Sequence, residues 1–306
     1  MKKFLPAIVA AVLLVVANGV LLVVLPSWHR AVELERAHGE IIHEEWSDFA
    51  HLRVRELPDS RRRSLTFVDA EGREQLQSRI DLDAPSRLEL RYSRAMFASF
   101  LLRETQPRVL IVGLGGGGMV RFLHAAMPET QVDVVEIDPA VVEVAAAYFG
   151  TDNGPRTTIH TADGFEYLGD ETGPKYDVIY LDAFLRPPVE AVAAALREKT
   201  QRLKTAAFLE QVRARLVDGG DSSGLVVFNL IKREASTDND LAAIRSVFPT
   251  VYEFDVAGTG NLVVIGSTDA ERIGAEEWKA RAAAWEEKAE WAREIELRKV
   301  VAGLRE

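Results

Sequence analysis

The sequence predicts an α/β fold in which helices cover both faces of a mostly parallel sheet. From residue 108 onward, short apolar runs alternate with amphipathic segments of helical periodicity, as in parallel sheets buried on both faces. The first apolar run passes directly into a glycine-rich turn, and an acidic residue ends the next run. A chain of 306 residues, 47% of them hydrophobic, is also long enough to bury a sizeable core.

The N-terminal segment 4–25 has no charged residue, and as a helix it would extend ~33 Å, enough to cross a bilayer core. A cleaved signal peptide would have a shorter apolar run and a cleavage site of small residues. We therefore predict an uncleaved transmembrane anchor over residues 1–30, with Trp28 at the interface. The polar, helix-compatible residues 31–42 that follow are predicted to form a stalk.

A small antiparallel β unit is expected next, so that stalk and β unit together occupy residues 31–87. Segments 51–56 and 64–68 have alternating or β-rich patterns. The turn residues 69–72 then lead into a further extended segment at 73–79.

The main domain is expected at residues 88–267 and begins with a helical segment at 88–102. Its last two strands are close in sequence, which predicts an antiparallel hairpin. The charged C-terminal region 268–306 should be helical, and its tryptophans recur at a spacing that favours packing on the domain over ligand binding. The strands are expected at 109–113, 131–136, 157–161, 176–182, 225–230, 251–255 and 261–265.

Charge and cysteine content exclude several classes of function. The formal net charge is −10 and no long run of Lys or Arg is present, so we expect no general nucleic-acid binding, which needs a basic face. The chain has no cysteine, which rules out disulfides, a thiol nucleophile and thiolate metal sites. No metal is predicted.

The glycine-rich turn after the first strand predicts a nucleotide site. Glycines allow a sharp turn and a close approach to a ligand, and the following helix offers unpaired N–H groups. Glu136 lies 23 positions after Gly113, at the end of the next strand, where an acid can accept both ribose hydroxyls. The spacing G-x-G-x-x-G alone would be weak evidence. The glycines of this turn are Gly113, Gly115, Gly116, Gly117 and Gly118.

Two further aspartates are predicted to line the same crevice, because Asp163 follows the third strand and Asp182 ends the fourth. Each alone could instead be a helix cap. Asp138 is expected to be such a cap, with Pro139 as the first helical residue. A dinucleotide-binding oxidoreductase would have the same glycine turn and acid, so that alternative stays open.

Taken together, these motifs resemble the spermidine synthase-like branch of class I S-adenosylmethionine-dependent methyltransferase-fold enzymes. The resemblance implies a Rossmann-like fold with a seven-stranded, mostly parallel sheet over about residues 88–266, preceded by a small β domain. The segments that carry it are 109–118, 134–139, 162–164 and 176–182.

The resemblance also implies roles for these residues. Glu136 would bind the ribose, and Asp163, next to Gly164, would bind the adenine amino group. The loop from Gly113 to Gly118 would hold the nucleoside and its tail. Asp182 would face the transferred group as the catalytic residue, acting as a base or positioning a cation.

Three positions depart from true aminopropyltransferases, which use decarboxylated S-adenosylmethionine. Gly116 and Leu185 stand where those enzymes have aspartates, and Arg94 stands where they have a glutamate. Each missing carboxylate weakens a site for an ammonium group. We therefore expect a transferase that uses S-adenosylmethionine or its decarboxylated form as co-substrate, with methyl transfer slightly preferred. The alternatives are a polyamine aminopropyltransferase (spermidine synthase) and a nucleoside-binding pseudoenzyme or sensor.

The acceptor and its access route are less defined. Residues 184–205 are longer than a simple link, so they are either a lid or a plain surface insertion. The acceptor stays open between a small molecule and a protein, and homodimer formation stays open as well. Because the donor is a cytoplasmic metabolite, we predict a single-pass membrane protein whose catalytic domain faces the cytoplasm.

Overall fold

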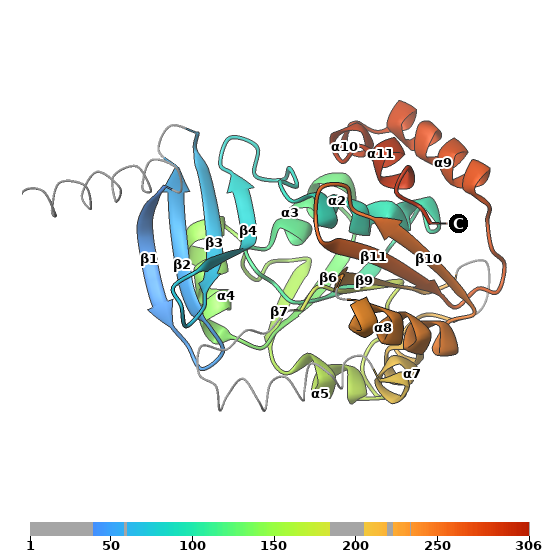
Figure 1. The fold of residues 1–306 in the computed structure, drawn as a ribbon, viewed down its shortest axis with the longest axis horizontal. Helices are drawn as coiled ribbons and strands as arrows, with labels where there is room; N and C mark the ends of the chain where they lie inside the picture. The colour runs from blue at the N-terminus through green and yellow to red at the C-terminus, as the bar shows by residue number, and fades with distance from the viewer. Residues whose placement is uncertain (1–38, 58–59, 184–204, 219–222, 233, 306) are drawn as a thin grey trace, which may run out of the picture.

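The computed structural model describes residues 39–57, 60–183, 205–218, 223–232 and 234–305. Within them, a small antiparallel sheet lies beside a larger α/β domain (Figure 1). The small sheet has the strand order β1-β2-β3-β4. Its strands are β1 (Glu40–Trp46), β2 (His51–Leu57), β3 (Arg62–Val68) and β4 (Glu74–Asp81).

Alternation along the strands decides which face of the small sheet is buried. Leu52 and Val54 in β2 are buried, whereas Arg53 and Arg55 between and after them are only partly buried. Successive side chains of a strand point to opposite faces, so one face is apolar and packs on the α/β domain, while the other carries charge. This packing forms one wall of the pocket described below.

The larger sheet has seven strands in the order β10-β11-β9-β8-β5-β6-β7. Strand β11 is antiparallel to both β9 and β10, and the remaining neighbours are parallel. The predicted Rossmann-like, mostly parallel sheet and its terminal hairpin are therefore confirmed. The strands are β5 (Arg108–Val112), β6 (Gln131–Glu136), β7 (Thr157–Thr161), β8 (Val178–Leu181), β9 (Leu225–Ile231), β10 (Thr250–Asp255) and β11 (Asn261–Ser267).

Helices cover both faces of this sheet because its central strands are apolar on both. In β5, Val109 and Ile111 join one buried cluster, and Leu110 and Val112 join the other. The first face carries α2 (Arg91–Met96), η1 (Phe97–Leu101), α3 (Gly118–Ala126) and α4 (Pro139–Phe149). The second carries α5 (Gly164–Gly169), α7 (Ala206–Ala214) and α8 (Glu234–Val247) (Figure 1).

The C-terminal region is helical, as predicted, but it is divided into three short helices. Glu296, between the last two, has a left-handed backbone with φ 57°. Trp278 packs edge-on against Tyr252 and Phe254 of β10, which confirms packing on the domain for this tryptophan. The helices are α9 (Ala275–Lys288), α10 (Glu290–Glu294) and α11 (Leu297–Val301).

The stalk prediction is wrong where the structure describes it. Residues 40–42 do not continue a helix but begin strand β1, which pairs with β2 from Glu40 to Trp46. Pairing with a neighbouring strand overrides the weak helical preference of these residues. The rest of the predicted stalk lies outside the described residues, as does the segment 184–204 of the predicted lid.

The predicted localisation as a single-pass membrane protein is corrected. Among the described residues, no helix is long and apolar enough to cross a membrane. Helices α8 and α9 have 14 residues each. Such helices extend ~21 Å, short of the ~30 Å apolar core of a bilayer. The predicted anchor at residues 1–30 lies outside the described residues, and no function below depends on it.

Candidate functional site

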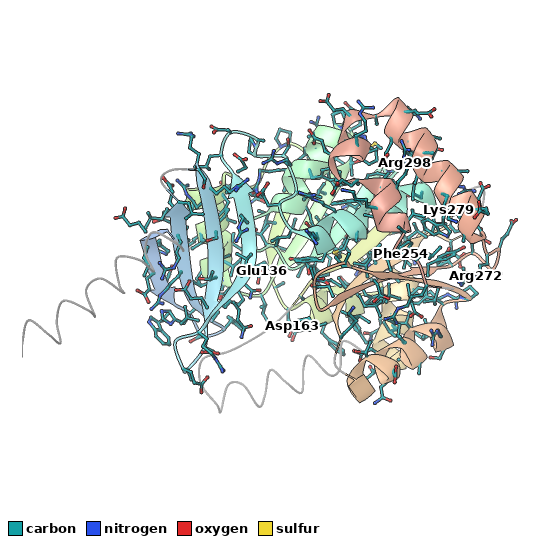
Figure 2. All side chains as sticks on the ribbon, turned by 45° about the horizontal axis from the view of Figure 1, so that its top comes forward. Glu136, Asp163, Phe254, Arg272, Lys279 and Arg298 are labelled. Atoms are coloured by element: carbon teal, nitrogen blue, oxygen red, sulfur yellow. The ribbon has the colours of Figure 1, made fainter. Side chains whose placement is uncertain are left out.

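A pocket opens at the carboxyl ends of β5, β6, β7 and β8, where the large sheet faces β4 and α2. Figure 2 shows Glu136 and Asp163 between the small sheet and the bulk of the α/β domain. The predicted site residues Glu136, Asp163, Gly164 and Asp182 all line this pocket, together with the glycine loop. Parallel strands bring these residues to one edge of the sheet because their carboxyl ends point the same way.

The backbone of the glycine loop requires glycine at several positions. Gly113, Gly115 and Gly117 have φ values of 98°, 52° and 70°, which other residues rarely adopt. A Cβ at Gly113 would lie 2.4 Å from the carbonyl oxygen of Asp182. A Cβ at Gly115 would lie 3.7 Å from Ser78 Cβ and would fill space between the loop and β4. The loop and the β4 residues Gln77 and Ser78 line the same pocket, so a ligand bound there would contact both.

Gly116 is the residue of this loop that does not line the pocket. A Cβ at this position would lie 2.7 Å from the ring of Phe149 and 2.7 Å from Ser78 Oγ. Phe149 is buried, so it has little room to move. An aspartate could not replace Gly116 unless both neighbours shifted, which gives a steric reason for the missing loop acid.

Glu136 ends β6 and is 9% exposed. Its Oε2 accepts a hydrogen bond from the backbone N–H of Leu114 at 2.8 Å, and its Oε1 accepts one from Asp138 at 3.0 Å. Burial raises the pKa of this carboxyl group, and the backbone N–H donors oppose that effect. A carboxylate has about four acceptor positions, so Glu136 retains capacity for hydroxyl donors from a ligand.

Asp138 has the structural role that its sequence context predicts. Its side chain accepts a hydrogen bond from the N–H of Ala140, and Pro139 is the first residue of α4. Ser47 Oγ also donates to Asp138 Oδ2 at 2.6 Å. The helix cap therefore connects α4 to the turn between β1 and β2 beside the pocket.

Asp163 combines the two roles that the sequence left open. It caps α5, because its Oδ1 accepts a hydrogen bond from the N–H of Phe165 at 2.9 Å, and it also lines the pocket. The next residue, Gly164, packs against β5, and a Cβ there would lie 2.7 Å from Val112 Cγ1. The cap therefore fixes Asp163 in the pocket that Glu136 also lines.

Asp182 follows β8 and is held by two polar side chains. Its Oδ1 accepts a hydrogen bond from Asn229 Nδ2 at 2.8 Å, and its carboxyl group also accepts one from Tyr92. Asn229 in turn accepts from Asn261 Nδ2 at 2.8 Å. Burial raises the pKa of Asp182 to about 7, despite these hydrogen bonds. A carboxylate with this pKa can take up a proton near neutral pH.

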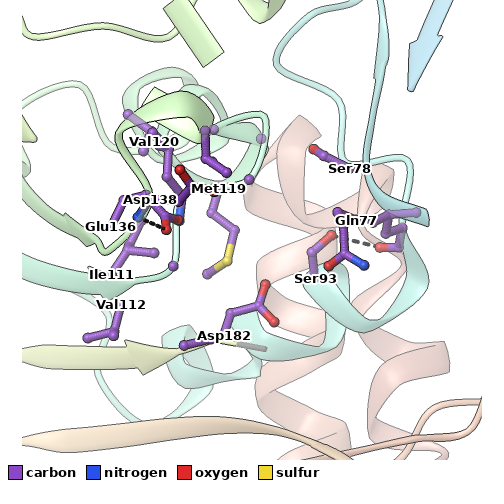
Figure 3. Close-up of a pocket in the computed structure, with 18 of the residues that line it drawn as sticks. Gln77, Ser78, Ser93, Ile111, Val112, Met119, Val120, Glu136, Asp138 and Asp182 are labelled. Atoms are coloured by element: carbon purple, nitrogen blue, oxygen red, sulfur yellow. Dashed lines mark hydrogen bonds between the residues drawn. The ribbon is translucent and has the colours of Figure 1, made fainter. Parts of the chain in front are cut away.

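Figure 3 shows the carboxyl group of Asp182 in the pocket close to Met119, with Gln77, Ser78 and Ser93 on the other side. Sequence reasoning did not assign Tyr92 or Asn229 to the site. Asn229 had a signal, because it is the one polar residue in the apolar run 225–231. Tyr92 had a weaker signal, because it lies two residues before Arg94, the position at which the family has a glutamate.

Arg94 does not line the pocket. Its Nε donates to the carbonyl of Leu88 at 2.7 Å, and its Nη1 lies 3.4 Å from Glu296 near the C-terminal helices. The basic residue at position 94 therefore brings no charge to the described pocket wall. Among the described residues, no group of three or more His, Asp or Glu side chains is arranged to hold a metal ion.

The strand order and the pocket together define the class of protein, a Rossmann-like domain of the methyltransferase fold. The family model described as "Spermine/spermidine synthase domain" matches residues 89–211. A polyamine aminopropyltransferase of Vibrio vulnificus is 32% identical over 228 residues, which are 74% of this chain and 71% of that protein. The chain belongs to the spermine/spermidine synthase family.

Other relatives are methyltransferases. The mouse eEF1A lysine and N-terminal methyltransferase is 33% identical over 168 residues, which are 54% of this chain. The chain spans only 23% of the length of that relative. A crystal structure of human methyltransferase-like protein 13 in complex with SAH matches at 30% identity with a TM-score of 0.56, covering 67% of this chain and 93% of that one. The predicted resemblance and the predicted enzyme class, an alkyl transferase, are thus confirmed at the level of the family.

Proposed function

We propose that this chain is a methyltransferase that moves a methyl group from S-adenosylmethionine to a nucleophilic acceptor. The observation that carries this proposal is the pocket, in which Glu136, Asp163 and Asp182 surround one glycine loop. The similarity to a structure in complex with SAH supports the same ligand class. Relatives named for protein and for polyamine substrates leave a protein or a small amine as the acceptor.

The residues of the pocket fit such a donor. Glu136 retains acceptor capacity for the two ribose hydroxyls, and Asp163 offers a carboxylate to the adenine amino group. Gly115 and Ser78 line this same pocket, where the tail of the donor would contact both. The N–H groups of the loop and of the start of α3 favour a carboxylate on that tail.

The chemistry requires alignment and removal of a proton. The lone pair of the acceptor attacks the methyl carbon, the carbon–sulfur bond breaks, and its electrons stay on sulfur as a neutral thioether. The protein aligns the two reactants in line, which accounts for much of the rate enhancement in such transfers. Asp182 accepts the proton that the acceptor loses, and Tyr92 and Asn229 fix the orientation of its carboxylate.

Aminopropyl transfer is the second candidate function. It is favoured by the similarity to the polyamine aminopropyltransferase, which extends over most of both chains. Gly116 argues against this function, because an aspartate at this position would clash with neighbouring side chains. An ammonium on the donor tail would then lack the partner that an aspartate at position 116 would provide.

The nucleoside product distinguishes the two reactions. The purified full chain would be incubated with either donor, together with a peptide library or with putrescine, and the nucleosides would be identified by mass spectrometry. We expect S-adenosylhomocysteine from S-adenosylmethionine. Formation of 5′-methylthioadenosine from the decarboxylated donor and putrescine would establish aminopropyl transfer instead. Absence of binding to both donors would contradict the proposed function as a whole.

A further inference from the structure

Arg121, in α3, contacts the glycine loop at Gly116, the loop residue that does not line the pocket. Its Nη1 donates to the carbonyl oxygens of Gly116 at 2.5 Å and of Phe149 at 2.9 Å, and to Thr151 Oγ1. Its Nε donates to the carbonyl oxygen of Pro85 at 2.9 Å. All four partners are neutral oxygens, so these contacts orient the guanidinium group without neutralising it.

The charge of Arg121 has no opposite charge beside it. In the part of the chain that the structure describes, no Asp or Glu oxygen lies within ion-pair distance of this side chain. Burial lowers the pKa of Arg121 to about 10. The group is still a full cation at neutral pH, in surroundings that screen it less than bulk water does.

The guanidinium group of Arg121 contacts the part of the glycine loop that faces the proposed donor tail. Gly115, Gly117 and Gly118 line the pocket, and Gly116 between them is hydrogen-bonded to Arg121. An aspartate at position 116 would have supplied a nearby negative charge. The chain has glycine there, and the contacts of its Cβ position with Phe149 and Ser78 oppose an acid at that site. The positive potential of Arg121 therefore adds to that of the α3 N-terminus at the loop.

We propose that Arg121 is a specificity-determining residue for the donor: its uncompensated charge favours a donor whose tail carries a carboxylate over the same donor without it. This inference rests on the proposed function, because it concerns the same pocket and donor. The two donors differ only in the carboxylate, so the ratio of their dissociation constants measures the effect. A unit charge that acts through a partly solvated pocket should change such a ratio by about three- to tenfold.

Thr151 provides the test, because its hydroxyl already contacts the guanidinium group. Thr151→Asp places a carboxylate beside Arg121 and leaves the contacts of Arg121 with the loop carbonyls possible. Thr151→Asn has nearly the same shape and no charge, and it is the matched control. Binding of S-adenosylmethionine and of its decarboxylated form to the full chain would be measured by calorimetry, together with Arg121→Lys, which retains the charge.

We expect the wild type and Thr151→Asn to prefer S-adenosylmethionine, and Thr151→Asp to reduce that preference about fivefold. Arg121→Lys should retain the preference because it retains the positive charge. A purely structural defect in this variant would weaken the binding of both donors equally and leave their ratio unchanged. An equal ratio in Thr151→Asp and Thr151→Asn would overturn the inference while leaving the proposed function intact. Failure of the wild type to bind either donor would contradict the proposed function itself. If Thr151→Asp does not fold, the ratio of the two dissociation constants is compared between Arg121→Gln and Arg121→Lys. Only Arg121→Gln, which removes the charge, should lower the preference for S-adenosylmethionine.

Discussion

Burial of Asp182 favours its neutral carboxyl group, whereas its proposed role as a base requires the ionised form. Its carboxyl group is taken out of water beside Tyr92 and Asn229, and its pKa rises from 3.8 to about 7. The same shift that makes it a base near neutral pH also costs stability when it ionises. Ionisation of this residue therefore lowers the stability of the folded chain, as is common at functional sites.

Replacing Asp182 by asparagine should separate these two effects. Methyl transfer should fall by about 10²- to 10⁴-fold, the usual contribution of a general base. The wild-type rate should rise with pH through about 7, because the base acts when ionised. A variant that retains both full activity and the pH profile would remove Asp182 from the mechanism.

The stability of the wild type should change with pH in the opposite sense to its activity. A pKa that is higher in the folded chain gives a stabilising contribution below 3.8 that is lost as pH rises through about 7. The wild type should therefore lose up to about 4 kcal/mol between pH 4 and pH 8 relative to Asp182→Asn. Urea denaturation of both proteins at the two pH values measures this difference, and parallel pH dependences would contradict it.

Glu136→Gln should weaken donor binding by more than tenfold. The substitution replaces a charged acceptor by an amide with one oxygen, and hydrogen bonds to charged groups contribute ~1.5–3 kcal/mol. Calorimetric titration with S-adenosylhomocysteine measures the loss. Glu143→Gln, an exposed position on α4, is the control and should bind normally. Equal affinity in the Glu136 and Glu143 variants would show that Glu136 is not a donor ligand.

At the scale of elements, the strand β5, the glycine loop and α3 form one unit whose backbone conformation is set by glycine. Gly117 is a strongly constrained member of this unit, since it has φ 70° and a Cβ there would lie 2.3 Å from the side chain of Thr151. Gly117→Ala should therefore destabilise the fold by about 2 kcal/mol or more. Gly154→Ala, where nothing lies within 4 Å of the added Cβ, should have little effect on the melting temperature. Similar melting temperatures for the two variants would contradict this account.

Elements also differ in how well their own sequence predicts them. The sequence predicts strands at residues 131–136 and 157–161, and the structure has strands over the same residues, because each is a short β-prone segment bounded by turn residues. The sequence does not predict strand β1 at Glu40–Trp46, where polar residues fit a helix equally well. Its conformation is set by pairing with β2, an interaction that no local pattern records.

At the scale of the whole molecule, the C-terminal helices complete the core of the sheet. Trp278 is fully buried against Tyr252 and Phe254, whereas Trp46 on the small sheet is 64% exposed. Trp278→Ala should cost about 3–5 kcal/mol through loss of packing and the cavity it leaves. Trp46→Ala should change stability by much less, and chemical denaturation of the two variants compares them directly. A small loss for Trp278→Ala would mean that the C-terminal helices add little to the fold.

The sequence by itself determined the architecture and the candidate pocket of this protein. Apolar strand runs, helix caps such as Asp138 and the glycine turn are local signals, and the rule that parallel strands present their carboxyl ends together brought Glu136, Asp163 and Asp182 to one edge. Tertiary structure alone decided what surrounds them. Tyr92 and Asn229 meet at Asp182 because packing joins elements that are distant in the chain. The same packing brings the neutral oxygens of Phe149 and Thr151, and no carboxylate among the described residues, to Arg121. Periodicity determines which face a side chain takes, but the environment that sets its charge and orientation comes from its neighbours in space.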